Sequence, residues 1–388
     1  MEHRTAPLVA GVGVLMVGNG LLLTLFGVRS TTAGFSAFVV GAVLSAYYIG
    51  FLAGSRVAPG LLRRVGSRRS FFLLAAMVSV VAILPPLRVV PWFWVSLRMA
   101  QGFCIAGLYV VIESWLNASA SNTNRGRVLG NYVAAMMTGF AIGALLYRLT
   151  GAAGALPWVV AGAVTLLAVA PVWSMRVEPT AAARGVAMRF RELTAVAPLG
   201  TAAMFVTALA NAALLGVAAV YATRSGFSVP RTAAFVCLGS VGALVLQAPL
   251  TRLADRYPRP NVLLCITTAA ALVATVMVFV PVDSPLPLVG MFLLGGLSYS
   301  QFSIVLAEVN DHLEHHHMAS AGAHLVAING VGSVTAPLLV AGAFLWIGND
   351  GYFWVVAAAH AAAGVTVLWF LRSSHRAARP VPAPVHAS

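Results

Sequence analysis

Long apolar runs dominate the pattern of hydrophobic and polar positions along this chain of 388 residues. Runs of about 20 apolar residues, the length that crosses the hydrocarbon core of a bilayer, alternate with short clusters rich in Gly, Pro and Arg. Twelve runs are expected, beginning near Leu8, Ala37, Ser70, Pro91, Val128, Ala155, Ala197, Thr232, Asn261, Leu286, Ala321 and Tyr352. The pattern predicts an all-α integral membrane protein with twelve transmembrane helices.

The composition separates this chain from soluble proteins and from proteins that bind nucleic acid. Hydrophobic residues make up 60% of the sequence and charged residues 9%, too few charges to cover the surface of a soluble domain. The formal net charge is +14, but no basic stretch is interleaved with aromatic residues as a nucleic-acid groove requires. We therefore expect the lipid bilayer as a partner, and no nucleic acid.

The sequence patterns that would indicate catalysis, metal binding or ATP use are missing. Cys104, Cys237 and Cys265 all fall inside apolar runs and lack the spacing of zinc ligands. The chain carries no phosphate-binding loop, so ATP is not expected to drive it. We predict no cofactor, no metal site and no enzymatic activity.

Arginines are divided unevenly between the two sets of loops that connect the runs. Eighteen lie in one set of loops and in the terminal segments, five lie in the opposite loops, and Arg98 lies inside an apolar run. The positive-inside rule places the arginine-rich loops in the cytoplasm, and both termini with them.

The chain contains an internal repeat. Asn19 and Asn211 lie in similar stretches 192 residues apart, and Phe35 and Phe227 keep the same offset. Two six-helix halves in parallel orientation are the plan of one large class of secondary transporter. We expect an N-terminal bundle over residues 1–174, a cytoplasmic linker over 175–196, a C-terminal bundle over 197–372 and a cytoplasmic tail over 373–388.

Three short motifs carry a resemblance to a known family. Arg98 to Gly102 reads R-x-x-Q-G, Leu253 to Arg256 reads L-x-D-R, and Leu61 to Arg69 is similar to the same loop motif, with Arg63 in place of the usual Asp. With these motifs, the chain resembles the major facilitator superfamily over nearly its whole length. The stretch from Glu113 to Arg127 also resembles a subgroup of poorly characterised bacterial permeases.

The resemblance implies a location and a mechanism. It implies two bundles that rock around a central cavity in a bacterial inner membrane, with proton coupling. The drug/proton antiporters of this family usually carry a Gly-Pro motif in span 5 and an acidic residue in span 1. Here span 5 has Gly139 to Gly143 without proline, and span 1 has Asn19. Multidrug efflux by proton antiport is therefore an alternative and not the first expectation.

Span 4 carries two charged residues, Arg98 and Glu113. At 1.5 Å and 100° per residue they lie about 22 Å apart along the helix and about 60° apart around it, so they cannot touch. We predict that Arg98 lines a substrate cavity together with Gln101 and Tyr109, because an intramembrane charge usually has a function. The alternative is an arginine that reaches the interface or ties helices together through backbone carbonyls.

A second group of charged residues is expected at the cytoplasmic ends of the helices. In the family, the loop motif and the end of the fourth helix of each half form charge clusters that close the cytoplasmic side. By resemblance we assign this gate to Arg63, Arg64, Arg68, Glu113, Arg125, Asp255, Arg256 and Glu308. Glu113 and Glu308 could instead carry a proton, since a desolvated carboxyl has the raised pKa that coupling needs.

Buried amides are further candidates for the cavity. Asn19 and Asn211 are equivalent in the repeat, and their helices line the cavity in the family. Gln301 shares a helical face with Glu308, and Asn131 shares one with Thr138. Each of these amides could equally join neighbouring helices.

The sequence therefore predicts a secondary active transporter for a small neutral or anionic amphipathic solute. With Arg98 as the one expected cavity charge, a cation is disfavoured. Two other functions stay open, a lipid or lysolipid flippase and a membrane sensor that does not transport. We expect a monomer that binds a small-molecule substrate and exchanges protons.

Overall fold

The computed structural model describes residues 2–119, 125–173, 188–314 and 317–377, and these residues form helices joined by short turns. Among the described residues, seven α-helices form the first half. They are α1 (Glu2–Thr32), α2 (Ala37–Val65), α3 (Ser67–Ile83), α4 (Pro91–Ser119), α5 (Arg125–Thr150), α6 (Leu156–Leu167) and α7 (Val169–Trp173), with a 3-10 turn at Pro85–Leu87 between α3 and α4.

The second half follows the same order after a short helix, α8 (Phe190–Val196), which precedes the seventh span. Its helices are α9 (Pro198–Gly216), α10 (Ala218–Arg224), α11 (Val229–Arg256), α12 (Arg259–Val278), α13 (Leu286–Asp311), α14 (Met318–Ile347) and α15 (Gly351–Ala377). The expected linker and tail lie partly outside the described residues.

The helices make twelve spans. Ten candidate spans correspond to single predicted runs, and the eleventh, Ser320–Ser373, contains both α14 and α15. A 3-10 turn at Gly348–Asp350 separates these two helices, and Gly348 has a φ of +67°, a conformation that favours glycine. The prediction of an all-α protein with twelve spans is therefore confirmed, and each helix start after the first lies within three residues of its predicted start.

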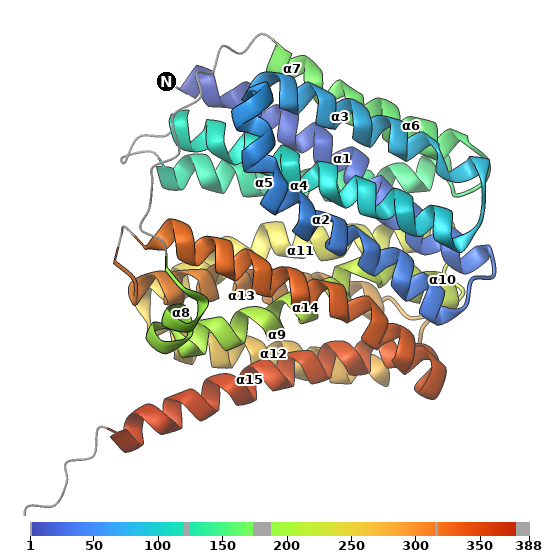
Figure 1. Cartoon of the computed structure of the whole chain (residues 1–388). Helices are drawn as coiled ribbons and strands as arrows, with labels where there is room; N and C mark the ends of the chain where they lie inside the picture. Colours follow the sequence, from blue (N-terminus) through green and yellow to red (C-terminus); the bar gives the residue numbers. More distant parts are fainter. Residues whose placement is uncertain (1, 120–124, 174–187, 315–316, 378–388) are drawn as a thin grey trace, which may run out of the picture.

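The helices pack into two bundles, α1–α7 and α9–α15, which lie one above the other in Figure 1. Among the described residues the bundles touch mainly where α2 meets α14, α5 meets α11 and α1 meets α10. The start of α1 and the end of α15 lie at the same end of the molecule, on the left of Figure 1. An even number of spans brings the two ends of the chain to the same end of the molecule, as seen here.

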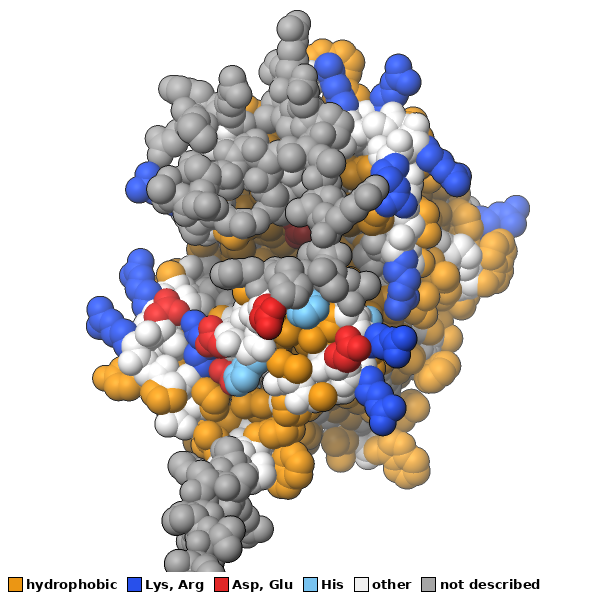
Figure 2. All heavy atoms as spheres, turned by 60° about the vertical axis from the view of Figure 1, so that its left-hand side comes forward, with side chains coloured by type: hydrophobic (Ala, Val, Ile, Leu, Met, Phe, Trp, Pro, Cys, Tyr) orange, Lys and Arg blue, Asp and Glu red, His pale blue; other side chains and the backbone are white. Residues whose placement is uncertain are grey.

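The two bundles are sealed at one end only. At the end that carries Arg88, one apolar cluster includes buried side chains of both halves, among them Phe26 and Trp94 with Tyr221 and Tyr352. Towards the opposite end the buried cores are separate, one within α1–α7 and one within the second half. Figure 2 looks onto that opposite end, where arginines gather and a hollow separates the halves. The structure is therefore open at the arginine-rich end.

Glycines allow the closest helix pair of each half to form. A Cβ atom added to Gly50 of α2 would lie 1.9 Å from the Met99 carbonyl oxygen of α4, and one added to Gly102 would lie 1.9 Å from the Tyr47 carbonyl oxygen. In the second half, Gly242 of α11, which is equivalent to Gly50 in the repeat, would meet the Phe292 carbonyl oxygen at 1.8 Å. The glycine of the R-x-x-Q-G motif thus serves backbone contact.

We expect Gly102→Val to destabilise the protein by about 1–3 kcal/mol or more, because the obstructing atoms belong to the backbone and cannot rotate away. The measurement is thermal unfolding of the purified protein in detergent. Gly130→Ala is the control, since a Cβ atom there meets nothing within 4 Å and alanine favours the helix. Equal melting temperatures for the Gly102→Val variant and the unmodified protein would contradict this packing.

Candidate functional site

A buried polar network lies where α1, α2 and α4 meet. Arg98 Nη1 donates a hydrogen bond to Gln101 Oε1 (2.7 Å), and Gln101 Nε2 donates to Asn19 Oδ1 (3.0 Å). Asn19 Nδ2 in turn donates to the Tyr47 hydroxyl (3.3 Å). Arg98 and Gln101 are 1% and 0% exposed. The network joins Arg98, Gln101 and Asn19, all expected at the cavity, with Tyr47 of α2.

Aromatic rings surround the guanidinium group. The Cζ atom of Arg98 lies 4.8 Å from the ring centroid of Phe26 and 4.6 Å from that of Tyr47. Among the described residues no carboxylate pairs with Arg98, and its Nε atom is buried without a hydrogen-bond partner. The electron-rich ring faces therefore take part of the role that a counter-ion would have.

Aromatic side chains continue from this network towards the open end. The rings of Tyr47 and Phe51 are 6.3 Å apart, and those of Phe51 and Tyr109 are 5.8 Å apart. Tyr299 of α13 lies near Tyr47, so the second half also places a tyrosine beside these rings. Sequence reasoning missed Phe51 and Tyr299, because an isolated aromatic residue in an apolar run carries no local signal.

Glu113 lies towards the open end of α4, apart from the Arg98 network. Its side chain is exposed, and the Tyr132 hydroxyl of α5 donates a hydrogen bond to its carboxylate. Arg98 is buried and bonds to Gln101 instead. The structure therefore confirms that Arg98 and Glu113 lie apart. It also places Tyr132 beside the Glu113 carboxylate.

The arginines expected at the gate of the first half make local contacts. Arg63, Arg64 and Arg68 are exposed. Arg68 Nη2 donates to the Trp173 carbonyl oxygen (2.7 Å), and its guanidinium lies 5.6 Å from the Phe72 ring centroid. This contact ties α3 to α7 within one half. The side chain of Arg125 lies outside the described part of the structure.

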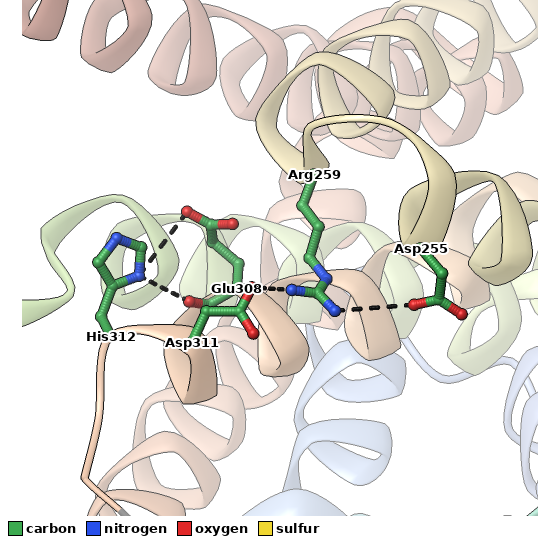
Figure 3. Close-up of polar contacts among 5 residues, drawn as sticks. All are labelled: Asp255, Arg259, Glu308, Asp311 and His312. Atoms are coloured by element: carbon green, nitrogen blue, oxygen red, sulfur yellow. Dashed lines mark hydrogen bonds and ion pairs between the residues drawn. The ribbon is translucent and has the colours of Figure 1, made fainter.

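In the second half an acidic cluster gathers around Arg259, as Figure 3 shows. Arg259 forms ion pairs with Asp255 (3.6 Å) and with Asp311 of α13. Glu308 is 9% exposed, and its Oε1 atom lies 3.9 Å from His312 Nδ1. Arg256 is exposed at the end of α11, so Arg259, one helix further on, is the arginine that bridges α11, α12 and α13.

The remaining amides lie in three different surroundings. Gln301 Nε2 lies 3.1 Å from Nδ1 of the fully buried His360, whose Nε2 lies 2.8 Å from the Ser298 hydroxyl. Because an amide nitrogen only donates, His360 Nδ1 accepts and the imidazole is neutral. Asn211 has a buried Oδ1 atom without a partner among the described residues. Asn131 lines a groove between α1 and α5.

A family model described as the Major Facilitator Superfamily matches residues 8–295 and 200–387. The chain belongs to the major facilitator superfamily. The two matches begin at residues 8 and 200, the same 192-residue offset as the internal repeat. Helix order, repeat and family model therefore agree on a transporter of this superfamily.

The chain is also similar to individual members of the superfamily. It is 25% identical over 388 residues to "Uncharacterized MFS-type transporter YcaD" of Escherichia coli O7:K1. The alignment covers 98% of this chain and 99% of that protein. It is 26% identical over 348 residues to the Salmonella arizonae protein of the same name, covering 88% and 90%.

Solved structures of the superfamily share the fold. The nucleoside transporter NupG matches with a TM-score of 0.74 and 14% identity, covering 95% of this chain and 98% of that one. A D-xylose-proton symporter matches with a TM-score of 0.76 and 13% identity, covering 94% and 96%. A bacterial homologue of the human lysosomal transporter Spinster, in an inward-facing conformation, matches at 0.70 and 14%, covering 98% and 99%.

We expect Tyr47→Leu to destabilise this transporter more than Tyr47→Phe. Phenylalanine keeps a ring over the guanidinium and loses one hydrogen bond, a cost of about 1 kcal/mol. Leucine also removes the cation–π contact, which contributes about 2 kcal/mol more where it is desolvated. Thermal unfolding in detergent measures the difference. If both variants melted at the same temperature, the ring would have no role in holding Arg98.

Proposed function

We propose that the protein is a secondary active transporter that moves a small neutral or anionic amphipathic solute by alternating access. The single observation that supports this most directly is a buried arginine without a carboxylate partner, placed behind an aromatic wall in a molecule sealed at one end. A buried cation of this kind attracts an anionic or strongly dipolar group, because the rings and the Gln101 amide offset its charge without a carboxylate to neutralise it.

The proposed path begins at the open, arginine-rich end. A solute would pass Tyr109 and Tyr47, whose rings offer apolar faces while their hydroxyls can form hydrogen bonds. Its anionic or polar end would turn towards Arg98. Contacts with Tyr299 would then draw the second half inward, and the contacts at the sealed end would have to part.

The structure of the open end suggests how protons could be coupled. Glu113 is exposed in the open state and accepts a hydrogen bond from Tyr132. Closure would remove water from this carboxylate, and burying an ionised carboxylate without a counter-ion costs several kcal/mol. Protonation of Glu113 would therefore accompany closure, which links proton movement to the transport cycle.

We further propose a monomer in the cytoplasmic membrane of a bacterium, with both termini and the arginine-rich end in the cytoplasm. The count of arginines supports this orientation through the positive-inside rule. In this orientation the structure is open to the cytoplasm. The exposed Arg63, Arg64 and the Arg259 cluster would then lie where the halves meet when the cytoplasmic side closes.

We expect Arg98→Gln to reduce transport of the true substrate about tenfold or more, the effect of losing a charge-assisted hydrogen bond. A thermal-shift screen of neutral, anionic and cationic solutes identifies a ligand, and uptake into proteoliposomes then measures transport. Arg148→Gln, at the sealed end of α5, is the control. Size-exclusion chromatography shows whether the Arg98→Gln protein is folded. Arg98→Lys keeps the positive charge, so its uptake shows whether the loss comes from the charge or from misfolding. Unchanged uptake by Arg98→Gln at every pH would refute the assignment.

We expect Glu113→Gln to uncouple transport from protons. The variant should still exchange substrate across the membrane, but a pH gradient should no longer accelerate uptake, because the amide mimics the protonated carboxyl. Counterflow and gradient-driven uptake in the same proteoliposomes measure the two activities. Asp283→Asn, an exposed carboxylate in the loop before α13, should leave both unchanged. A pH response retained in Glu113→Gln would exclude Glu113 as the proton site.

A further inference from the structure

A groove of about 880 Å³ runs between α1 and α5, separate from the polar network around Arg98. Small residues form its α1 wall, including Ala6, Ala10 and Gly13, and Val9, Val14 and Val17 extend it. On α5 the groove is lined by Arg127, Asn131, Thr138 and Ile142 with apolar neighbours. It is thus a long, mostly apolar channel with one arginine at the arginine-rich end.

The groove faces the surrounding lipid. Asn131, Thr138, Ile142 and Leu145 are exposed and recur on one face of α5, since intervals of 7, 11 and 14 residues return to within about 40° on a helix. Ile142 and Leu145 are each 44% exposed at the level where the halves are sealed together, so this face cannot point into the space between them. Tyr132, next to Asn131, is buried and bonds to Glu113 on the other side of α5.

The polar groups of the groove are arranged by depth. Arg127 lies at its mouth, in the first turn of α5. Asn131 follows about 6 Å deeper, at 1.5 Å per residue. The Asn131 side chain forms no hydrogen bond with the described part of the chain. An amide facing hydrocarbon without a partner costs about 1–3 kcal/mol or more, so the site favours a ligand that satisfies it.

We propose that this groove binds an anionic phospholipid. Its phosphate would lie at Arg127, a carbonyl oxygen of its ester linkage would accept a hydrogen bond from the Asn131 amide, and one acyl chain would lie along Ala10, Val14 and Val17. The order of charge, amide and apolar wall along the groove matches the order of phosphate, ester and chain in such a lipid. Basic pockets between transmembrane helices bind lipid head groups in this way.

The test uses the purified full-length protein, delipidated in detergent and titrated with dioleoyl phosphatidylglycerol. Native mass spectrometry counts bound lipid, and thermal unfolding reports the stabilisation. We expect one saturable site in the unmodified protein. Arg127→Gln and Asn131→Leu should each weaken it about tenfold, the effect of one hydrogen bond to a charged or buried group. Ala10→Phe should abolish it, because the ring fills the groove.

Matched controls and a second probe make the outcome decisive. Arg148→Gln removes an exposed arginine from the other end of α5, and Leu145→Phe enlarges an exposed side chain that does not line the groove. Both should bind the lipid like the unmodified protein. Equal loss in these controls would indicate non-specific attraction and overturn the proposal. Stabilisation by inorganic phosphate alone would indicate a free-anion site and overturn it as well.

Discussion

The buried guanidinium of Arg98 is the constraint on which the first half of the molecule depends. Arginine stays charged in a protein, and an intramembrane charge costs several kcal/mol unless its surroundings compensate. Compensation here comes from the rings of Phe26 and Tyr47 and from the Gln101 amide oxygen, which three different helices supply. The Tyr47 ring reaches the charge because Gly102 lets α2 and α4 meet at backbone distance. Charge, rings and glycine therefore form one unit.

The second half repeats the scaffold without repeating the charge. Gly242 brings α11 and α13 together as Gly50 brings α2 and α4 together. Phe292 meets Gly242 as Met99 meets Gly50, so the position equivalent to Arg98 is the buried, apolar Met291. A buried polar group of the second half is the neutral His360. A symmetric framework with one buried cation gives the two halves different chemistry. Recognition of a polar solute would rest on the first half, and its release on the movement of the second.

The two ends of the molecule differ for a simple physical reason. At the sealed end, rings and aliphatic side chains of both halves gain by leaving water or lipid together. At the other end each half buries its own core and presents arginines, which remain hydrated at the surface in Figure 2. Arg259 is held by acidic residues of its own half in this state, so its contacts do not oppose opening.

The sequence by itself determined the twelve spans, the repeat and the separation of Arg98 from Glu113, because run length and helical spacing are local properties of the chain. Only the tertiary structure decided what each residue faces. Gln301 points to His360, Arg259 replaces Arg256 as the partner of acidic residues, and Asn131 lies on the lipid-facing side of α5. Helical spacing fixes the angle between two residues of one helix, but the neighbour at that angle depends on how twelve helices pack.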